Sequence, residues 1–124
     1  MIKEIEKPNI DFKFFISDYI NFKYYYNKET NEYFIESKNK SKIYFNLEGN
    51  AHRIGKPAIE YYDGVKIWAE NGKEHRLDGP SFIYKDHLEF HINNKSYFEA
   101  KFAEKTNHLI CKFCGQFCKQ SCFF

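Results

Sequence analysis

A tandem repeat constrains this chain more than any other feature of its sequence. The segment His52-Arg53-Ile54-Gly55-Lys56-Pro57-Ala58 recurs 23 positions later as His75-Arg76-Leu77-Asp78-Gly79-Pro80-Ser81. The match extends on both sides of this segment. It pairs Phe45 with Trp68, Gly49 with Gly72, Ile59 with Phe82 and Tyr61 with Tyr84. A chain with such a period is predicted to fold as copies of one unit, each packed against its neighbour.

Alternating apolar and polar residues predict that this unit is a β-hairpin. Asp63-Gly64 and Asn71-Gly72 separate such runs and favour two-residue turns with positive φ, and Asp86-His87 and Asn93-Asn94 take their places in the second unit. The predicted strands are residues 10–16, 19–26, 32–36, 42–47, 57–62, 65–70, 81–85 and 88–92, with a short helix over 17–22 as an alternative. The predicted fold is mainly β: an antiparallel meander of tandem β-hairpin repeats, clear over 42–95 and degenerate over 10–41, with a C-terminal capping helix.

The alternation also separates the two faces of the predicted sheet. The apolar face is predicted to be the core. It contains Ile59, Tyr61, Val65, Ile67 and Ala69 in the first unit, and Phe82, Tyr84, Leu88, Phe90 and Ile92 in the second. On the opposite, mixed face, Tyr62, Trp68 and His91 are the candidate partner-binding residues, because aromatic side chains often anchor protein interfaces. The alternative is that the aromatic residues only pack across strands.

The hydrophobic period changes after residue 95. Ser96 and Glu99 have the spacing of a capping box, and Phe98, Phe102 and Leu109 follow at helical spacing. A helix from about residue 97 to about residue 109 is therefore predicted to cap the open end of the sheet. The chain then divides into a repeat sheet over 1–95 and a helix with a cysteine-rich tail over 96–124.

The repeated polar residues are predicted to hold the hairpins together, since every unit must solve the same turn problem whereas a catalytic group is needed only once. Arg76 is expected to bond to Asp78 or to backbone carbonyls, and His75 to donate to a carbonyl. This structural role is assigned to His52, Arg53, His75, Arg76, Asp78, Gly79 and Pro80; no catalytic residue is assigned.

In Glu74–Pro80 and Trp68–Lys73 the chain resembles the MORN-like β-hairpin repeat family, which has a His-Arg-x-Asp-Gly-Pro-Ala signature. That family occurs in uncharacterised proteins of large DNA viruses, phages and bacteria. His52–Ala58 departs from the signature, because Gly55-Lys56 replaces Asp-Gly. The resemblance implies stacked hairpins that serve as an interaction or membrane-proximal scaffold. It also implies a viral or phage factor that acts on a host protein.

A separate cluster near the C-terminus contains Cys111, Cys114, Cys118 and Cys122, with His108 just before it. Residues 111–115 resemble one zinc knuckle, and four thiolates, or three with His108, would satisfy tetrahedral zinc. The spacing differs from that of zinc ribbons and of ferredoxin-type iron–sulfur sites. The same offsets place all four cysteines on one helix face. Zinc binding, burial on a helix face or a disordered tail, and redox or disulfide use all stay open, and the phenylalanines of this tail add homo-oligomerisation as an expectation.

Composition excludes several classes of function. The net charge is only +2, with acidic and basic residues interspersed, which argues against a nucleic-acid partner. No apolar run has the length of a signal peptide or of a membrane span of roughly 20 residues, so a cytoplasmic, reducing location is expected. The chain has no P-loop, dinucleotide-binding, zincin or serine-hydrolase motif.

The function predicted from the sequence is a non-enzymatic protein–protein interaction module. One alternative is a zinc-dependent regulator or nucleic-acid binder that acts through the cysteine tail. The other is a small-ligand sensor or enzyme with a pocket between the sheet and the helix.

Overall fold

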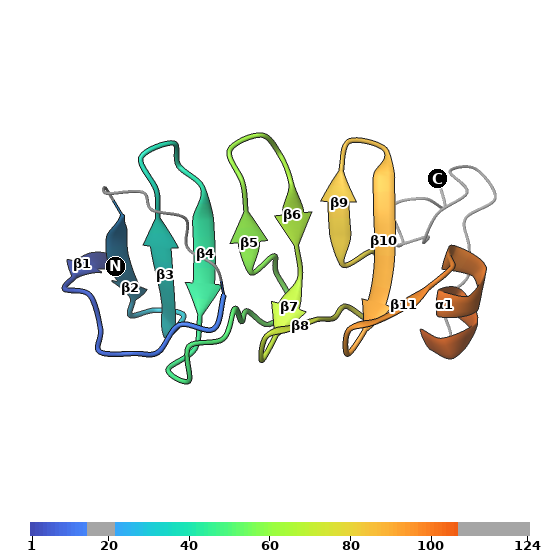
Figure 1. Cartoon of the computed structure of the whole chain (residues 1–124), viewed down its shortest axis with the longest axis horizontal. Coiled ribbons are helices and arrows are strands. Elements are labelled where there is room, and N and C mark those ends of the chain that lie inside the picture. The colour runs from blue at the N-terminus through green and yellow to red at the C-terminus, as the bar shows by residue number, and fades with distance from the viewer. Residues whose placement is uncertain (15–21, 107–124) are drawn as a thin grey trace.

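The computed structural model describes residues 1–14 and 22–106 and shows one long antiparallel sheet followed by a helix (Figure 1). The strands of the sheet are β1 (Ile2–Ile5), β2 (Lys23–Asn27), β3 (Glu32–Glu36), β4 (Lys42–Phe45), β5 (Ile59–Glu60), β6 (Lys66–Ile67), β9 (Phe82–Tyr84), β10 (His87–Ile92) and β11 (Lys95–Tyr97), in that spatial order. β7 (Ala69–Glu70) and β8 (Lys73–Glu74) form a separate two-stranded ribbon, and α1 spans Glu99–Thr106. The predicted mainly β meander with a C-terminal helix is confirmed.

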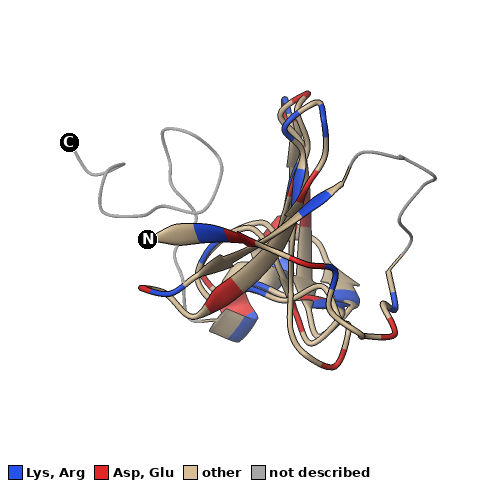
Figure 2. Ribbon diagram, turned by 90° about the vertical axis from the view of Figure 1, so that its left-hand side faces the viewer, with Lys and Arg blue, Asp and Glu red and all other residues tan. Residues whose placement is uncertain are grey.

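The hairpins β3–β4, β5–β6 and β9–β10 stand side by side along the sheet. Viewed from the end of the sheet, their tips line up one behind another (Figure 2). Lysine, arginine, aspartate and glutamate are interspersed over the ribbon in this view, as the sequence predicted. Each hairpin therefore contacts mainly the hairpin before it and the hairpin after it, as expected of a repeat array.

The strand predicted over 10–16 is wrong for residues 10–14, and residues 15–16 lie outside the described ranges. This segment instead crosses the sheet: the backbone N–H of Lys13 donates to the carbonyl of Gly49 at 2.8 Å. The ring of Phe12 lies against the rings of Tyr24 and Phe45, at centroid distances of 6.2 and 5.0 Å. The apolar alternation here reflects packing onto a sheet face, whereas the short strand β1 was not predicted.

Other predicted strands are shorter in the structure, and the run over 65–70 is interrupted at Trp68. The backbone N–H of Trp68 still donates to the carbonyl of Ser81, the residue just before β9, whereas Ala69 pairs with Glu74. The chain thus exchanges one pairing partner for another at Trp68. This exchange produces the β7–β8 ribbon, whose second strand was not predicted, and neither was β11.

Turn length decides which side chains share a face. In the β5–β6 hairpin the backbone N–H of Tyr61 donates to the carbonyl of Val65, so the three residues 62–64 form the turn beyond this last bonded pair. Tyr84 pairs directly with His87, so only residues 85 and 86 connect β9 to β10. The turn predicted at Asp63-Gly64 is therefore wrong in length, because it has three residues. The turn predicted at Asp86-His87 is wrong in position, because it consists of residues 85 and 86. Those at Asn71-Gly72 and Asn93-Asn94 are present, and all four residues have positive φ.

The shorter second turn moves β10 by one position relative to the 23-residue repeat, and a one-residue shift turns every side chain to the other face. Phe82 lies opposite Glu89, and Leu88 lies opposite Ile83. The prediction that Leu88, Phe90 and Ile92 share a face with Phe82 and Tyr84 is therefore wrong.

The register defines two faces across the sheet. Face A carries the cross-strand row Tyr24, Ile35, Ile43, Ile59, Ile67, Phe82 and Glu89. Face B carries the row Lys23, Glu36, Lys42, Glu60, Lys66 and Ile83. The charges alternate in sign along the first five positions of face B, an arrangement that favours pairing of neighbouring strands and suits a solvent-exposed row.

The buried residues form two groups along the sheet. Ala51, Ala58 and Ala69 form one group, against which Phe14, Ile43 and Ile59 pack. Phe90, Phe102 and Ala103 form the other, where α1 packs on β10 with Leu88, Ile92 and Tyr97 around it. The helix therefore covers the last long strand of the sheet.

The capping box predicted for this helix is wrong. Ser96 lies in β11 opposite His91, and the helix begins at Glu99. The first helical bond runs from the N–H of Phe102 to the carbonyl of Phe98. Burial raises the pKa of the Glu99 carboxyl above its ordinary value. The predicted continuation over 107–109 lies outside the described residues.

Two glycine substitutions test the crossing of residues 10–13 over the β4 end of the sheet. Gly49 has φ +87°, and a Cβ there would lie 2.0 Å from the carbonyl oxygen of Asp11; Gly64 has φ +100° and open space around it. Gly64→Ala is expected to lower the free energy of unfolding by about 1 kcal/mol, from backbone strain alone. Gly49→Ala adds a collision with backbone and is expected to cost about 3 kcal/mol or more. Urea unfolding midpoints measure both; equal losses would show that the segment does not cross there.

Candidate functional site

The two His-Arg loops make the same contacts on face B. The guanidinium carbon of Arg53 lies 3.7 Å from the ring centroid of Tyr44, and that of Arg76 lies 3.9 Å from the ring centroid of Trp68. Each guanidinium also donates to the carbonyl of the proline four residues later, at 3.3 and 3.0 Å. The expected bond from Arg76 to Asp78 is present at 2.8 Å. Each arginine therefore ties its loop to the hairpin before it.

The first loop has no acidic residue at the position of Asp78, because Gly55 stands there. Arg53 instead donates to Glu32 of β3 at 2.9 Å and pairs with Glu60 at 3.3 Å. Burial raises the pKa of the Tyr44 phenol above its ordinary value, and the neighbouring Arg53 acts in the opposite direction. The same stacking is thus supported by different carboxylates in the two units.

The histidines of the two loops accept hydrogen bonds through Nδ1, whereas His75 was expected to donate to a carbonyl. Nδ1 of His52 accepts from the backbone N–H of Asn71 at 2.9 Å, and Nδ1 of His75 accepts from that of Asn93 at 3.0 Å. Asn71 and Asn93 are the first residues of the two positive-φ turns. Each histidine therefore holds the turn of the following ribbon.

Backbone hydrogen bonds give a structural alignment of the two units. The N–H of His52 donates to Tyr44 and the N–H of His75 to Trp68, so Tyr44, and not Phe45, is the equivalent of Trp68. Four further pairs follow in the same way from matching bonds. They are Ala51 with Glu74, Ala58 with Ser81, Ile67 with Glu89, and Ala69 with His91.

This alignment identifies a polar cluster that has replaced an apolar one. The first unit has Ala51, Ala58 and Ala69 packed together, with Ile67 nearby in sequence. The second unit has Glu74, Ser81, His91 and Glu89 at the same four positions. Because the first unit builds the same backbone with alanines, the fold does not require the polar side chains. The cluster of Glu74, Ser81, Glu89 and His91, here called the polar cluster, is the candidate functional site.

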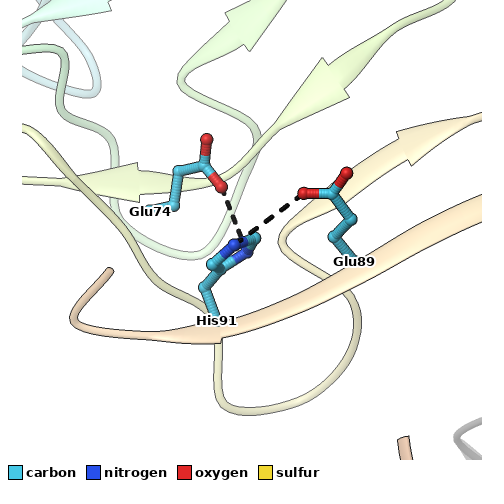
Figure 3. Close-up of side chains that lie close together, drawn as sticks. All are labelled: Glu74, Glu89 and His91. Carbon is cyan, nitrogen blue, oxygen red and sulfur yellow. Dashed lines mark ion pairs between the residues drawn. The ribbon is translucent and has the colours of Figure 1, made fainter. Parts of the chain in front are cut away.

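Glu74 reaches this cluster from β8, and Glu89 and His91 project from β10 (Figure 3). Nδ1 of His91 lies 3.0 Å from Oε2 of Glu74, and Nε2 lies 3.8 Å from Oε1 of Glu89. Ser81 is fully buried, and its Oγ lies 2.6 Å from Nδ1 of His91. The imidazole is thus held between two carboxylates and a buried hydroxyl, in a residue that is only 9% exposed.

The hydroxyl of Ser81 faces two polar partners. Its Oγ lies 3.4 Å from the backbone carbonyl oxygen of Glu89 and 2.6 Å from Nδ1 of His91. Ser81 therefore fixes the orientation of the imidazole ring.

Serine, histidine and glutamate together bring to mind a hydrolytic triad, but the geometry here does not fit one. A triad needs the serine on one ring nitrogen and the carboxylate on the other. Ser81 contacts Nδ1 and Glu89 lies nearest Nε2, but the 3.8 Å from Nε2 to Glu89 is longer than a hydrogen bond and Ser81 has no exposed surface. The polar cluster can hold a proton or a cation, but this arrangement provides no accessible nucleophile.

A second feature is the uncovered part of face A. Ile59, Tyr61, Val65, Ile67, Phe82 and Tyr84 share this face over β5, β6 and β9, and none of them is buried by the described residues. Over β3 and β4 the same face is covered, and Ile35 and Phe45 are only 1% and 3% exposed. Ile59 packs at the edge of the alanine core, as predicted, whereas the prediction that the other five residues form the core is wrong. The six residues are here called the open apolar face.

The structure does not bring the predicted partner-binding residues together. Tyr62, at the tip of the β5–β6 hairpin, is 69% exposed. Trp68 lies beyond the other end of β6 under Arg76, and His91 is buried in the polar cluster. The predicted metal ligands Cys111, Cys114, Cys118, Cys122 and His108 lie outside the described residues, so zinc binding by the tail stays a prediction.

A hollow of about 320 Å³ lies between the sheet and the helix, where a ligand pocket was expected. Its lining is mainly apolar, from Leu88, Phe90, Tyr97 and Phe98, with Glu89, Ser96 and Lys101 also present. A larger hollow of about 520 Å³ lies elsewhere, between the β2–β3 turn and the first His-Arg loop. Ligand binding or catalysis in either hollow stays a prediction.

Comparisons with known proteins add no relative: no protein-family model, curated protein or solved structure matches the chain. Resemblance to MORN-like repeats therefore stays a prediction from the sequence. In the part of the chain that the structure describes, no helix has the length and apolarity needed to cross a membrane.

Sequence reasoning missed Glu74 and Glu89 as candidate site residues. In the sequence Glu74 is prominent only as part of the repeat signature, and Glu89 is one of several polar residues in an alternating strand. The signal in the sequence that could have identified the cluster is the difference between the two units: positions that hold alanine in the first unit hold glutamate or histidine in the second. That signal becomes readable only when the changed turn lengths are included in the alignment.

Substitution of the buried cluster tests whether its members act as one unit. Glu74→Ala/Ser81→Ala/His91→Ala recreates the alanine set of the first unit. Each single substitution leaves a buried partner of the same network unsatisfied, which costs roughly 1–3 kcal/mol. The loss of unfolding free energy in the triple variant is therefore expected to be smaller than the sum of the three single losses, by about 1 kcal/mol or more. Denaturant unfolding measures this difference, and strictly additive losses would contradict a coupled network.

Proposed function

We propose that this protein is a non-enzymatic interaction module that binds another protein through the open apolar face. The observation that carries the proposal is the uneven cover of face A. Phe12 and Phe14 pack over the first part of this face, whereas Tyr61, on the second part, is 43% exposed. A contiguous apolar surface of this kind is typical of a protein-binding site.

The chemistry of the face indicates the kind of partner. All six residues of the open apolar face are aliphatic or aromatic, whereas Glu60 and Lys66 occupy face B of the same hairpin. Two tyrosines, Tyr61 and Tyr84, combine a large apolar ring with a hydroxyl that stays wet, a combination enriched at interfaces. The partner is therefore expected to present an uncharged apolar surface, bordered by polar groups that meet His87 and Glu89 at the β10 side.

A matched pair of lysine substitutions tests this assignment. Tyr84 and Ile83 are adjacent in β9, but Tyr84 projects from face A and Ile83 from face B. Burying an unpaired lysine in an interface is costly. Tyr84→Lys is therefore expected to reduce recovery of a partner by about tenfold or more, which corresponds to about 1.4 kcal/mol, and Ile83→Lys to leave recovery close to wild type.

Recovery is measured by affinity capture from an extract of the source cells, followed by binding assays with the purified partner. Thermal unfolding of both variants checks that each is folded. Equal recovery by the two lysine variants would assign the interaction to another surface, and a partner retained only through residues 107–124 would assign it to the tail.

A further inference from the structure

We infer that Glu74, Glu89 and His91 form a binding site for a divalent transition-metal ion of the zinc class, with Ser81 positioning the imidazole. One carboxylate oxygen of each glutamate and a ring nitrogen of His91 all lie within 4.8 Å of one another. This inference does not rest on the cysteine tail, and it shares only Glu89 with the proposed interaction surface. Three steps support it.

The first step is the comparison of the two repeat units. The backbone hydrogen bonds that place Ala51, Ala58, Ile67 and Ala69 in the first unit place the four members of the polar cluster in the second. Burying the polar groups of Ser81 and His91 is costly for stability, because these groups lose hydration. The first unit forms the same backbone with apolar residues, on which Phe14 packs, so the fold itself does not call for polar groups at these positions.

The second step is the electrostatics of the imidazole. Oε2 of Glu74 lies 3.0 Å from Nδ1 of His91, and Oε1 of Glu89 lies 3.8 Å from Nε2. Two carboxylates that face one imidazole from both sides favour a bound cation.

The third step is the donor set and its fit. Imidazole nitrogen with carboxylate oxygen suits zinc and similar transition metals, whereas calcium and magnesium prefer oxygen alone. Metal-bound histidines commonly fix their second nitrogen with a hydrogen bond, which is the role of Ser81 here. Three protein ligands also leave a position for water, as in open zinc sites.

A small closure of the side chains completes the fit. Tetrahedral zinc, with bonds of about 2.0–2.2 Å, requires ligand atoms roughly 3.4 Å apart. The side chains of Glu74 and Glu89 are 37% and 43% exposed, so they have room to rotate, whereas that of His91 is held at 11% exposure. The Glu89 carboxylate therefore needs to approach Nε2 from 3.8 Å to roughly 3.4 Å, and the Glu74 carboxylate, 3.0 Å from Nδ1, needs to rotate toward the same side of the ring.

The test separates this site from the cysteine tail. In one protein Cys111, Cys114, Cys118 and Cys122 are all replaced by serine; its control carries Glu74→Ala/Ser81→Ala/His91→Ala in addition. Zinc chloride is added to each, and the melting temperature and the ¹⁵N shifts of the histidine rings are recorded. Zinc is expected to raise the melting temperature and to shift Nε2 of His91 in the first protein only. Cobalt(II) is expected to give visible absorption without a thiolate charge-transfer band.

An unchanged melting temperature with unshifted His91 resonances, or the same response in the control, would overturn the assignment. A response to protons but not to zinc would show that the cluster holds a proton only. If the serine variant does not fold, metal content is compared with the cysteines intact. Wild-type protein saturated with zinc is then expected to hold one equivalent more than Glu74→Ala/Ser81→Ala/His91→Ala, and equal content would overturn the inference.

Discussion

The guanidinium groups of Arg53 and Arg76, stacked on the rings of Tyr44 and Trp68, are the interactions on which the rest of this structure depends. A hairpin with one partly solvated face is marginally stable alone. By stacking on the preceding hairpin and donating to a proline carbonyl in its own loop, each arginine closes a small core on face B. After β10 the described chain continues into β11 and α1, and not into a third His-Arg loop, and Phe102 of α1 packs on Phe90. Phe90 corresponds to Trp68, because it lies between Glu89 and His91, the equivalents of Ile67 and Ala69. The helix thus takes the place that the next arginine would have, which explains why a helix can end the array.

The contacts of the His-Arg loops, here called the loop frame, are the same in both units, whereas the lengths of the hairpin turns and the side chains on the hairpins differ. The hairpin turn has three residues between Tyr61 and Val65 and two between Tyr84 and His87, yet both units keep the same loop contacts. The change turns Leu88 and Phe90 of β10 to face B, where they form the seat for α1, and turns Glu89 to face A. The same frame holds three alanines in one unit and Glu74, Ser81 and His91 in the other. The proposed interaction surface and the proposed metal site therefore both lie at positions that the loop frame does not constrain.

The sequence predicted the fold class, the positive-φ turns at Asn71-Gly72 and Asn93-Asn94, and the terminal helix, because each rests on local chemistry. Face assignment failed in β10, since a fixed period cannot reveal that one turn is a residue shorter. The alternation of Ile10, Phe12 and Phe14 was read as a strand, because packing across a sheet and pairing within it leave the same pattern. The polar cluster was missed since Glu74 and His91 are 17 positions apart in sequence and meet only through the β8 and β10 geometry. Burial of the open apolar face was expected because apolarity was equated with core.

A double-mutant cycle on Arg76 and Trp68 tests the importance of the stacked arginine most directly. The unfolding free energies of wild type, Arg76→Ala, Trp68→Leu and the double variant are compared by urea denaturation. A coupling energy of about 1–2 kcal/mol is predicted, since the stacked guanidinium is largely shielded from water. The matched cycle on Lys95 and Tyr97, whose ammonium lies 5.5 Å from the ring centroid at an exposed edge, is predicted to give less than about 0.5 kcal/mol. Equal coupling in the two cycles, or none for Arg76 and Trp68, would contradict the view that arginine stacking holds the repeats together.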